Sequence, residues 1–167
     1  MNSYYNTVGV RELCHDIKNT SSNKDAILTM AEYFANLNIL DGSCIIIPAP
    51  QHYGYADYTL QIAVRVSKVT GAKVLDILKC RPRDMLYDLK KQGKGNVPNI
   101  YLSEDIRLSG KFYFLDNVIS TGATYFEACS VTGIRLNPLV YAIDETSLEP
   151  SLMRRLFLYA KLLYSVT

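Results

Sequence analysis

The stretch KFYFLDNVISTGAT, residues 111–124, decides the fold of this chain. Its first half, Phe112 to Leu115, is apolar and aromatic, which is typical of a buried central strand. Asp116 follows at once, and a turn rich in hydroxyls and glycine comes after it, Ser120 to Thr124. The pattern predicts a strand over 111–115 that ends in an acid and a short turn.

The same stretch has the features of a phosphate-binding turn. Residues 125–131 contain neither proline nor glycine and carry Glu127 in what we take as the first turn of a helix. The N–H groups of a turn and of the helix start after it point to one place and carry partial positive charge. Gly122 lets a phosphate oxygen approach the backbone without meeting a Cβ, and Thr121 and Thr124 supply hydroxyl donors.

This pattern closely resembles the PRPP-binding motif of the type I phosphoribosyltransferases. That motif has four apolar residues, two acids, two mostly apolar residues and a hydroxyl-rich T-G-x-T turn. In this chain the acid pair falls on Asp116 and Asn117, so the second acid is replaced by an amide. The phosphate turn of the motif corresponds to Ser120, Thr121, Gly122, Ala123 and Thr124. An ordinary strand–turn–helix junction capped by threonines is the alternative interpretation.

The resemblance implies a specific chemistry. Ser120 to Thr124 would hold the 5′-phosphate of PRPP, and Asp116 would bind a ribose hydroxyl directly or through water on magnesium. The Mg²⁺ cofactor would bind mostly through oxygens of the substrate, because this ion prefers few protein ligands. The implied reaction transfers phosphoribosyl to a nitrogen acceptor and releases pyrophosphate. The motif makes Asn117 the second candidate catalytic residue beside Asp116, since an amide can hydrogen-bond a ribose hydroxyl. Asn117 contributes no negative charge at the reacting ribose, so a non-catalytic protein that binds PRPP or a nucleotide for regulation is the alternative.

Upstream of the motif, a second strand runs into an informative loop. Ser43 to Ile47 is short and apolar, and PAPQHYG follows at 48–54. In the resembling family, the loop after the first core strand cradles pyrophosphate, which implies this role for Ala49, Pro50, Gln51 and His52. Pro-Ala-Pro also ends ordinary strands, and His52 is equally compatible with an exposed loop position.

Other stretches complete the predicted fold. Apolar spacing predicts helices over 24–36 and 55–70, the second ending at Gly71, and composition predicts strands over 73–78 and 137–143. Strands separated by helices predict an α/β fold with an open, mainly parallel sheet flanked by helices, as in type I phosphoribosyltransferases. Both informative loops leave the carboxyl end of a strand, where ligands bind in such sheets. The length of 167 residues predicts a single domain over 1–167.

Three segments have open interpretations. Residues 1–20 are weakly patterned and fit either a short strand or the start of a helix. The basic segment at about 80–98 includes Arg81 and Arg83. The resembling family carries a flexible lid or hood at this position, whose cations meet pyrophosphate. The arginine-bearing segment is weakly similar to that of the ComF-like group. A solvated basic loop is the alternative. Residues 151–164 form a basic amphipathic segment, which favours a helix packed on the sheet or against a second subunit of a homodimer over one on a membrane surface.

Composition excludes several classes of function. A net charge of +2, without charge clustering, gives no dedicated nucleic-acid surface. The chain has no apolar stretch of the ~20 residues that a membrane span requires, and its N-terminus does not read as a signal peptide. Four widely spaced cysteines and two histidines argue against a zinc site or a disulfide framework, so we expect a reducing, cytoplasmic setting. Walker and dinucleotide-binding glycine motifs are absent from the sequence.

Overall fold

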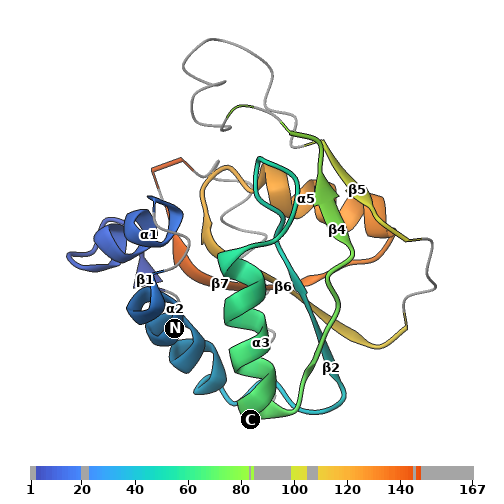
Figure 1. The fold of residues 1–167 in the computed structure, drawn as a ribbon, viewed down its shortest axis with the longest axis horizontal. Coiled ribbons are helices and arrows are strands. Elements are labelled where there is room, and N and C mark those ends of the chain that lie inside the picture. The colour runs from blue at the N-terminus through green and yellow to red at the C-terminus, as the bar shows by residue number, and fades with distance from the viewer. Residues whose placement is uncertain are drawn as a thin grey trace.

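The computed structural model describes residues 3–19, 23–82, 84, 99–104, 109–144 and 146–147. The fold is α/β, with a parallel sheet flanked by helices (Figure 1), as predicted. The strands are β1 (Ser3–Tyr4), β2 (Cys44–Pro48), β3 (Lys73–Val74), β4 (Leu78–Cys80), β5 (Ile100–Leu102), β6 (Lys111–Ile119) and β7 (Asn137–Ile143). The helices are α1 (Val10–Asn19), α2 (Lys24–Ala35), α3 (Tyr58–Thr70) and α5 (Ala123–Thr132).

The main sheet has the strand order β1-β7-β6-β2-β3, and all its pairings are parallel. From β2 the chain crosses through α3 to β3 on one side, and from β6 it crosses through α5 to β7 on the other side. The direction of winding therefore reverses between β2 and β6. In open α/β sheets the loops diverge at such a switch point, and ligands bind there, at the carboxyl ends of the strands.

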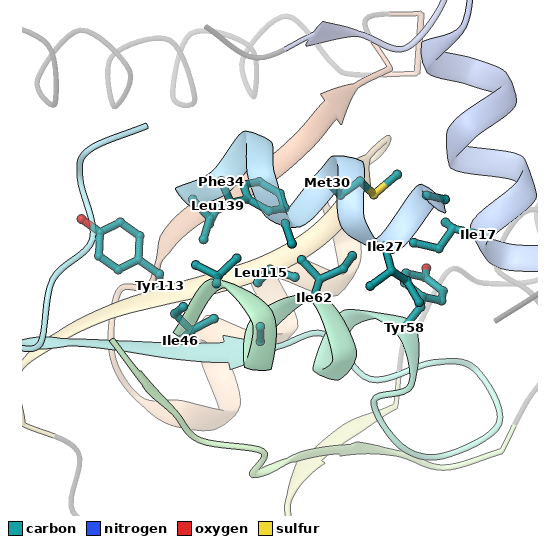
Figure 2. Packing of buried hydrophobic residues seen from close by; sticks show 14 of the residues in the cluster. Ile17, Ile27, Met30, Phe34, Ile46, Tyr58, Ile62, Tyr113, Leu115 and Leu139 are labelled. Atoms are coloured by element: carbon teal, nitrogen blue, oxygen red, sulfur yellow. The ribbon is translucent and has the colours of Figure 1, made fainter. Parts of the chain in front are cut away.

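Two hydrophobic clusters cover the two faces of the sheet. On one face, Tyr113 and Leu115 of β6 pack with α1, α2 and α3, as Figure 2 shows. On the other face, Phe112 and Phe114 pack with α5, where Tyr125 lies edge-to-face with Phe114 at 5.9 Å between ring centroids. Successive side chains of a strand point to opposite faces. A strand buried on both faces therefore needs the continuous apolar run that the sequence shows.

β6 is longer than the sequence indicated. The strand does not stop at residue 115 but continues to Ile119, so Asp116 lies within the strand. The pairing with β7 continues through Asp116↔Val140 and Ile119↔Ile143. The two polar residues fit into the strand because both are hydrogen-bonded: the Asn117 N–H donates to Asp116 Oδ1 at 2.8 Å, and the Asn117 side chain has partners in the core.

The strand predicted over 73–78 is also corrected. Only β3 joins the main sheet, and one further bond, from the Leu75 N–H to the Ile46 carbonyl at 2.9 Å, extends it. The chain then leaves the sheet, and β4 pairs antiparallel with β5 in a separate two-stranded ladder. Asp76 lies at this break and forms an ion pair with Lys79 at 2.7 Å. A charged residue that needs solvent and a partner explains why the strand does not continue.

Most other predicted elements are confirmed within one to three residues, and the position of Glu127 is corrected. Glu127 lies beyond the first turn of α5, where its Oε1 accepts the Ile100 N–H at 3.1 Å. The open N-terminal segment contains both a short strand, β1, and a helix, α1. Arg83, most of the predicted lid at about 80–98, and the predicted helix at 151–164 lie outside the described residues. Among the residues that are described, no helix is long and apolar enough to cross a membrane.

Candidate functional site

The turn between β6 and α5 is built around Gly122. This residue is the N-cap of α5, with φ 78° and ψ 0°, in the left-handed region that glycine adopts at little cost. Thr121 Oγ1 accepts the Ala123 N–H at 3.4 Å, while Ser120 is exposed and Thr124 is half-buried. The first N–H groups of a helix have no acceptor within the helix. The turn therefore presents N–H and hydroxyl donors of the kind that bind an anion.

Asp116 lies four residues before this turn, near the carboxyl end of β6. Its side chain is half-buried, and its Oδ1 accepts the Asn117 N–H, a bond that leaves Oδ2 for a ligand. Burial raises the pKa of Asp116 to about 6, although the positive charge of Lys18 and the Asn117 N–H both act to lower it. The carboxylate is therefore held in a poorly solvated place, where an incoming cation or hydroxyl donor would stabilise its charged form.

Asn117 faces the core, not the site. It is 1% exposed, its Oδ1 accepts the Tyr58 hydroxyl at 3.2 Å, and its Nδ2 donates to the Cys14 carbonyl at 3.3 Å. The Tyr58 oxygen is in turn hydrogen-bonded by the side chain of Gln51. This buried network joins the loop after β2, the start of α3, β6 and α1. The geometry does not support the ribose-binding role that the motif implied for Asn117.

Replacing Tyr58 with phenylalanine should lower the free energy of unfolding by about 1–3 kcal/mol, because Asn117 Oδ1 then stays buried without a donor. Urea denaturation of the variant measures this loss. Tyr101→Phe is a suitable control, since Tyr101 is 45% exposed. Equal stability of the two variants would show that the Tyr58–Asn117 bond adds nothing to the fold.

The loop after β2 lies beside β6, but two of its N–H groups are already used. The Ala49 N–H donates to the Leu115 carbonyl, and the Gln51 N–H donates to the Tyr55 carbonyl, both at 2.9 Å. Pro50 has no N–H to offer. The buried Thr59 hydroxyl also donates to the Ala49 carbonyl at 2.7 Å, which fixes the start of the loop. In this conformation the N–H groups of Ala49 and Gln51 are not available to the pyrophosphate that the resemblance implied at this loop.

His52 belongs to a row of aromatic rings on the same loop. The His52 and Tyr53 rings meet edge-to-face at 5.1 Å between centroids, and Tyr53 meets Tyr55 in the same way at 5.2 Å. The Tyr53 hydroxyl donates to Asp57 Oδ2 at 2.9 Å, which fixes its ring. Tyr53 and Tyr55 are 39% and 57% exposed. His52 is thus placed by its ring neighbours at the carboxyl end of β2.

The two ends of the predicted lid are held together. In the β4–β5 ladder Cys80 is opposite Ile100, and the N–H of the exposed Arg81 donates to the Asn99 carbonyl at 3.0 Å. The Cys80 N–H also donates to the Gly54 carbonyl at 2.8 Å, which ties this ladder to the loop after β2. The basic segment therefore leaves and rejoins the described fold beside that loop. Arg81 is the first cation of this segment.

The fold brings the two predicted loops to adjacent strands. β2 and β6 pair up to Pro48↔Leu115, so the loop with Gln51 and His52 and the turn with Gly122 both follow the carboxyl ends of neighbouring strands. Sequence reasoning did not find the connection through Tyr58, nor the position of α1 beside Asp116. No local pattern signals either of them, because both are long-range contacts.

A magnesium ion at this place would have to be held mainly by oxygens of a bound substrate. Among the described residues, no three His, Cys, Asp or Glu side chains come together to hold a metal. Asp116 is a half-buried carboxylate with one oxygen not engaged by the Asn117 N–H, which is the kind of donor that Mg²⁺ takes together with phosphate oxygens and water. Asp116 would hold the ion directly or through water.

No protein-family model matches the chain, and comparison with the curated proteins finds no match. The functional assignment therefore depends on the residues and their geometry.

Proposed function

We propose that this protein is a phosphoribosyltransferase of the type I fold, which binds PRPP or a related sugar or nucleotide 5′-phosphate with magnesium. One observation carries the proposal: Asp116 lies in the central strand β6, and the Gly122 turn joins this strand to α5, at the switch point of a parallel sheet. The resemblance of residues 112–124 to the PRPP motif supplies the ligand class.

In this function the turn with Gly122 holds the 5′-phosphate, and Asp116 binds a ribose hydroxyl. The C1–O bond to pyrophosphate breaks, a C1–N bond to the acceptor forms, and the acceptor nitrogen loses a proton. The ribose carries positive charge between these events, and the carboxylate of Asp116 stabilises it at a distance. Asp116 would hold Mg²⁺ directly or through water, and the ion would supply positive charge to the leaving pyrophosphate. The protein contributes mainly position and charge.

A second function, binding without turnover, is favoured by two observations. Position 117 carries an amide in place of the second acid, and this amide is turned into the core, so the motif supplies one carboxylate instead of two. Ala49 and Gln51 use their N–H groups within the protein, so fewer donors remain for a leaving pyrophosphate. A PRPP or nucleotide sensor needs the 5′-phosphate site, but it needs neither a second carboxylate nor donors for a leaving pyrophosphate.

Release of pyrophosphate from PRPP separates the two functions. The protein is incubated with PRPP, Mg²⁺ and a panel of nucleobases and related heterocycles, and pyrophosphate is followed by ³¹P NMR. The transferase predicts release that depends on one acceptor and on Mg²⁺. Tight PRPP binding without release for any acceptor would leave the sensor as the function.

A further inference from the structure

α1 separates its charges onto two flanks. Arg11, His15 and Lys18 follow the spacing i, i+4, i+7, which places them on one face of a helix. Glu12 and Asp16 lie on the other flank, and Glu12 Oε2 accepts the Gly9 N–H at 2.8 Å, so it has a structural role at the helix start. All three basic residues are exposed. We call Arg11, His15 and Lys18 the basic flank.

The first two residues of the basic flank, Arg11 and His15, lie at the carboxyl end of the sheet. His15 Nε2 is hydrogen-bonded to the Tyr5 hydroxyl at 2.8 Å, and Arg11 hydrogen-bonds the same hydroxyl. Tyr5 directly follows β1, and its N–H donates to the carbonyl of Ile143, the last residue of β7, at 2.9 Å. This end of the sheet is also where α3 begins (Figure 1).

The other end of the flank reaches the candidate site. The bond from Asn117 Nδ2 to the Cys14 carbonyl fixes the middle of α1 against β6, and Ile17 packs near Tyr58 in the core (Figure 2). Lys18 is one turn beyond Cys14, and its charge acts on Asp116. Seven residues of helix, at 1.5 Å each, make the flank about 10 Å long. Asp116 is opposite Val140, three residues or about 10 Å before the end of β7, so the flank is as long as this stretch of the sheet edge.

We infer that the basic flank of α1 binds the diphosphate group of the ligand, and this inference rests on the proposed function. A diphosphate carries several negative charges and needs cations and donors around it. The loop at Ala49 to Gln51 offers few N–H donors, because two are used and Pro50 has none. The flank supplies the missing positive charge from α1, a helix in which sequence reasoning identified no site residue.

Binding of inorganic pyrophosphate with Mg²⁺ tests the inference, measured by calorimetry in the presence of ribose 5-phosphate, which occupies the turn at Gly122. The variant Arg11→Gln/Lys18→Gln should bind pyrophosphate at least about tenfold more weakly, because charge-assisted hydrogen bonds are lost. Glutamine keeps the helix propensity. The control Arg65→Gln/Lys68→Gln removes two exposed cations from α3, which runs away from the carboxyl end, and should bind within about twofold of wild type.

Two results would overturn the inference: wild type that does not bind pyrophosphate, or a flank variant that binds it as well as the control does. Urea denaturation of each variant shows whether the fold is kept. Binding of ribose 5-phosphate alone reports on the proposed function separately. If ribose 5-phosphate binds and the flank variant still takes pyrophosphate normally, the inference fails while the proposed function stands.

Discussion

Replacing Asn117 with aspartate is expected to lower the free energy of unfolding by about 3–5 kcal/mol near pH 7, although it completes the acid pair of the PRPP motif. Asn117 is 1% exposed, and its Nδ2 donates to the Cys14 carbonyl at 3.3 Å. In an aspartate at this place, one carboxylate oxygen keeps the Tyr58 hydroxyl as its donor, but the other faces the Cys14 carbonyl, a second acceptor, so the buried charge is poorly compensated. The variant should also release pyrophosphate no faster, because the new carboxylate faces the core.

The pH dependence of this loss has a definite sign. Burial raises the pKa of a carboxyl group placed at position 117. The penalty is therefore small below about pH 3, where the group is mostly protonated in both states, and it grows as the pH rises from about 4 through its raised folded-state pKa. Urea denaturation at several pH values measures it.

Asn23→Asp is the matched control for this change. Asn23 caps α2, and its Oδ1 accepts the Ala26 N–H at 3.1 Å, a role that aspartate fills equally well. The same chemical change should therefore alter stability little at position 23. If Asn117→Asp were as stable as this control, or released pyrophosphate faster than wild type, the side chain at 117 would face the ligand instead.

Replacing Asp116 with asparagine should slow pyrophosphate release by about 10²–10³-fold and at the same time stabilise the free protein by about 1–2 kcal/mol near pH 8. The rate falls because the asparagine amide carries no charge to oppose the positive ribose. Stability rises because burial raises the pKa of Asp116 to about 6 in the folded protein. At about pH 8 the ionised carboxylate is therefore less favourable in the folded state than in the unfolded state, and asparagine removes this cost. Partial exposure of the side chain reduces this gain below the full value of the shift.

The gain should depend on pH in a way that identifies Asp116. A group with a raised folded-state pKa contributes its stability below the unfolded value of about 4, and this stability is lost as the pH rises through about 6. The variant and wild type should therefore be alike near pH 4 and diverge up to about pH 7. Asp16→Asn, an exposed carboxylate on α1, is the control. A constant difference between Asp116→Asn and wild type across this range would contradict the burial of Asp116.

Local patterns predicted the parts of the site that are local in structure. The apolar run of Phe112 to Leu115, the glycine turn and the helix after it are contiguous, so composition and spacing were enough to place them. The extension of β6 through Asp116 depends on β7, which continues beside it. A charged residue in a run of apolar ones suggests the end of a strand, and only the neighbouring strand shows that it is not.

The role of Asn117 could not be predicted from the sequence for a related reason. Its partners Tyr58 and Cys14 are 59 and 103 residues away, and neither pairing leaves a local pattern. The motif suggested a weakened acid pair at the ligand, whereas the fold uses the amide because it both accepts and donates. The basic flank of α1 was not predicted, because residues 1–20 fitted either a short strand or the start of a helix. Only a helix brings Arg11, His15 and Lys18 onto one face.

Stabilisation by ribose 5-phosphate tests the phosphate site most directly. At 100 times its Kd the ligand should raise the free energy of unfolding of wild type by about 2.7 kcal/mol. Thr121→Ala/Thr124→Ala, which removes two hydroxyl donors, should show a gain smaller by at least about 1.3 kcal/mol at the same concentration, as for a tenfold weaker Kd. Thr29→Ala/Ser130→Ala, at two exposed helix positions, should keep the full gain. No gain in wild type, or equal gains in all three proteins, would contradict a phosphate site at this turn.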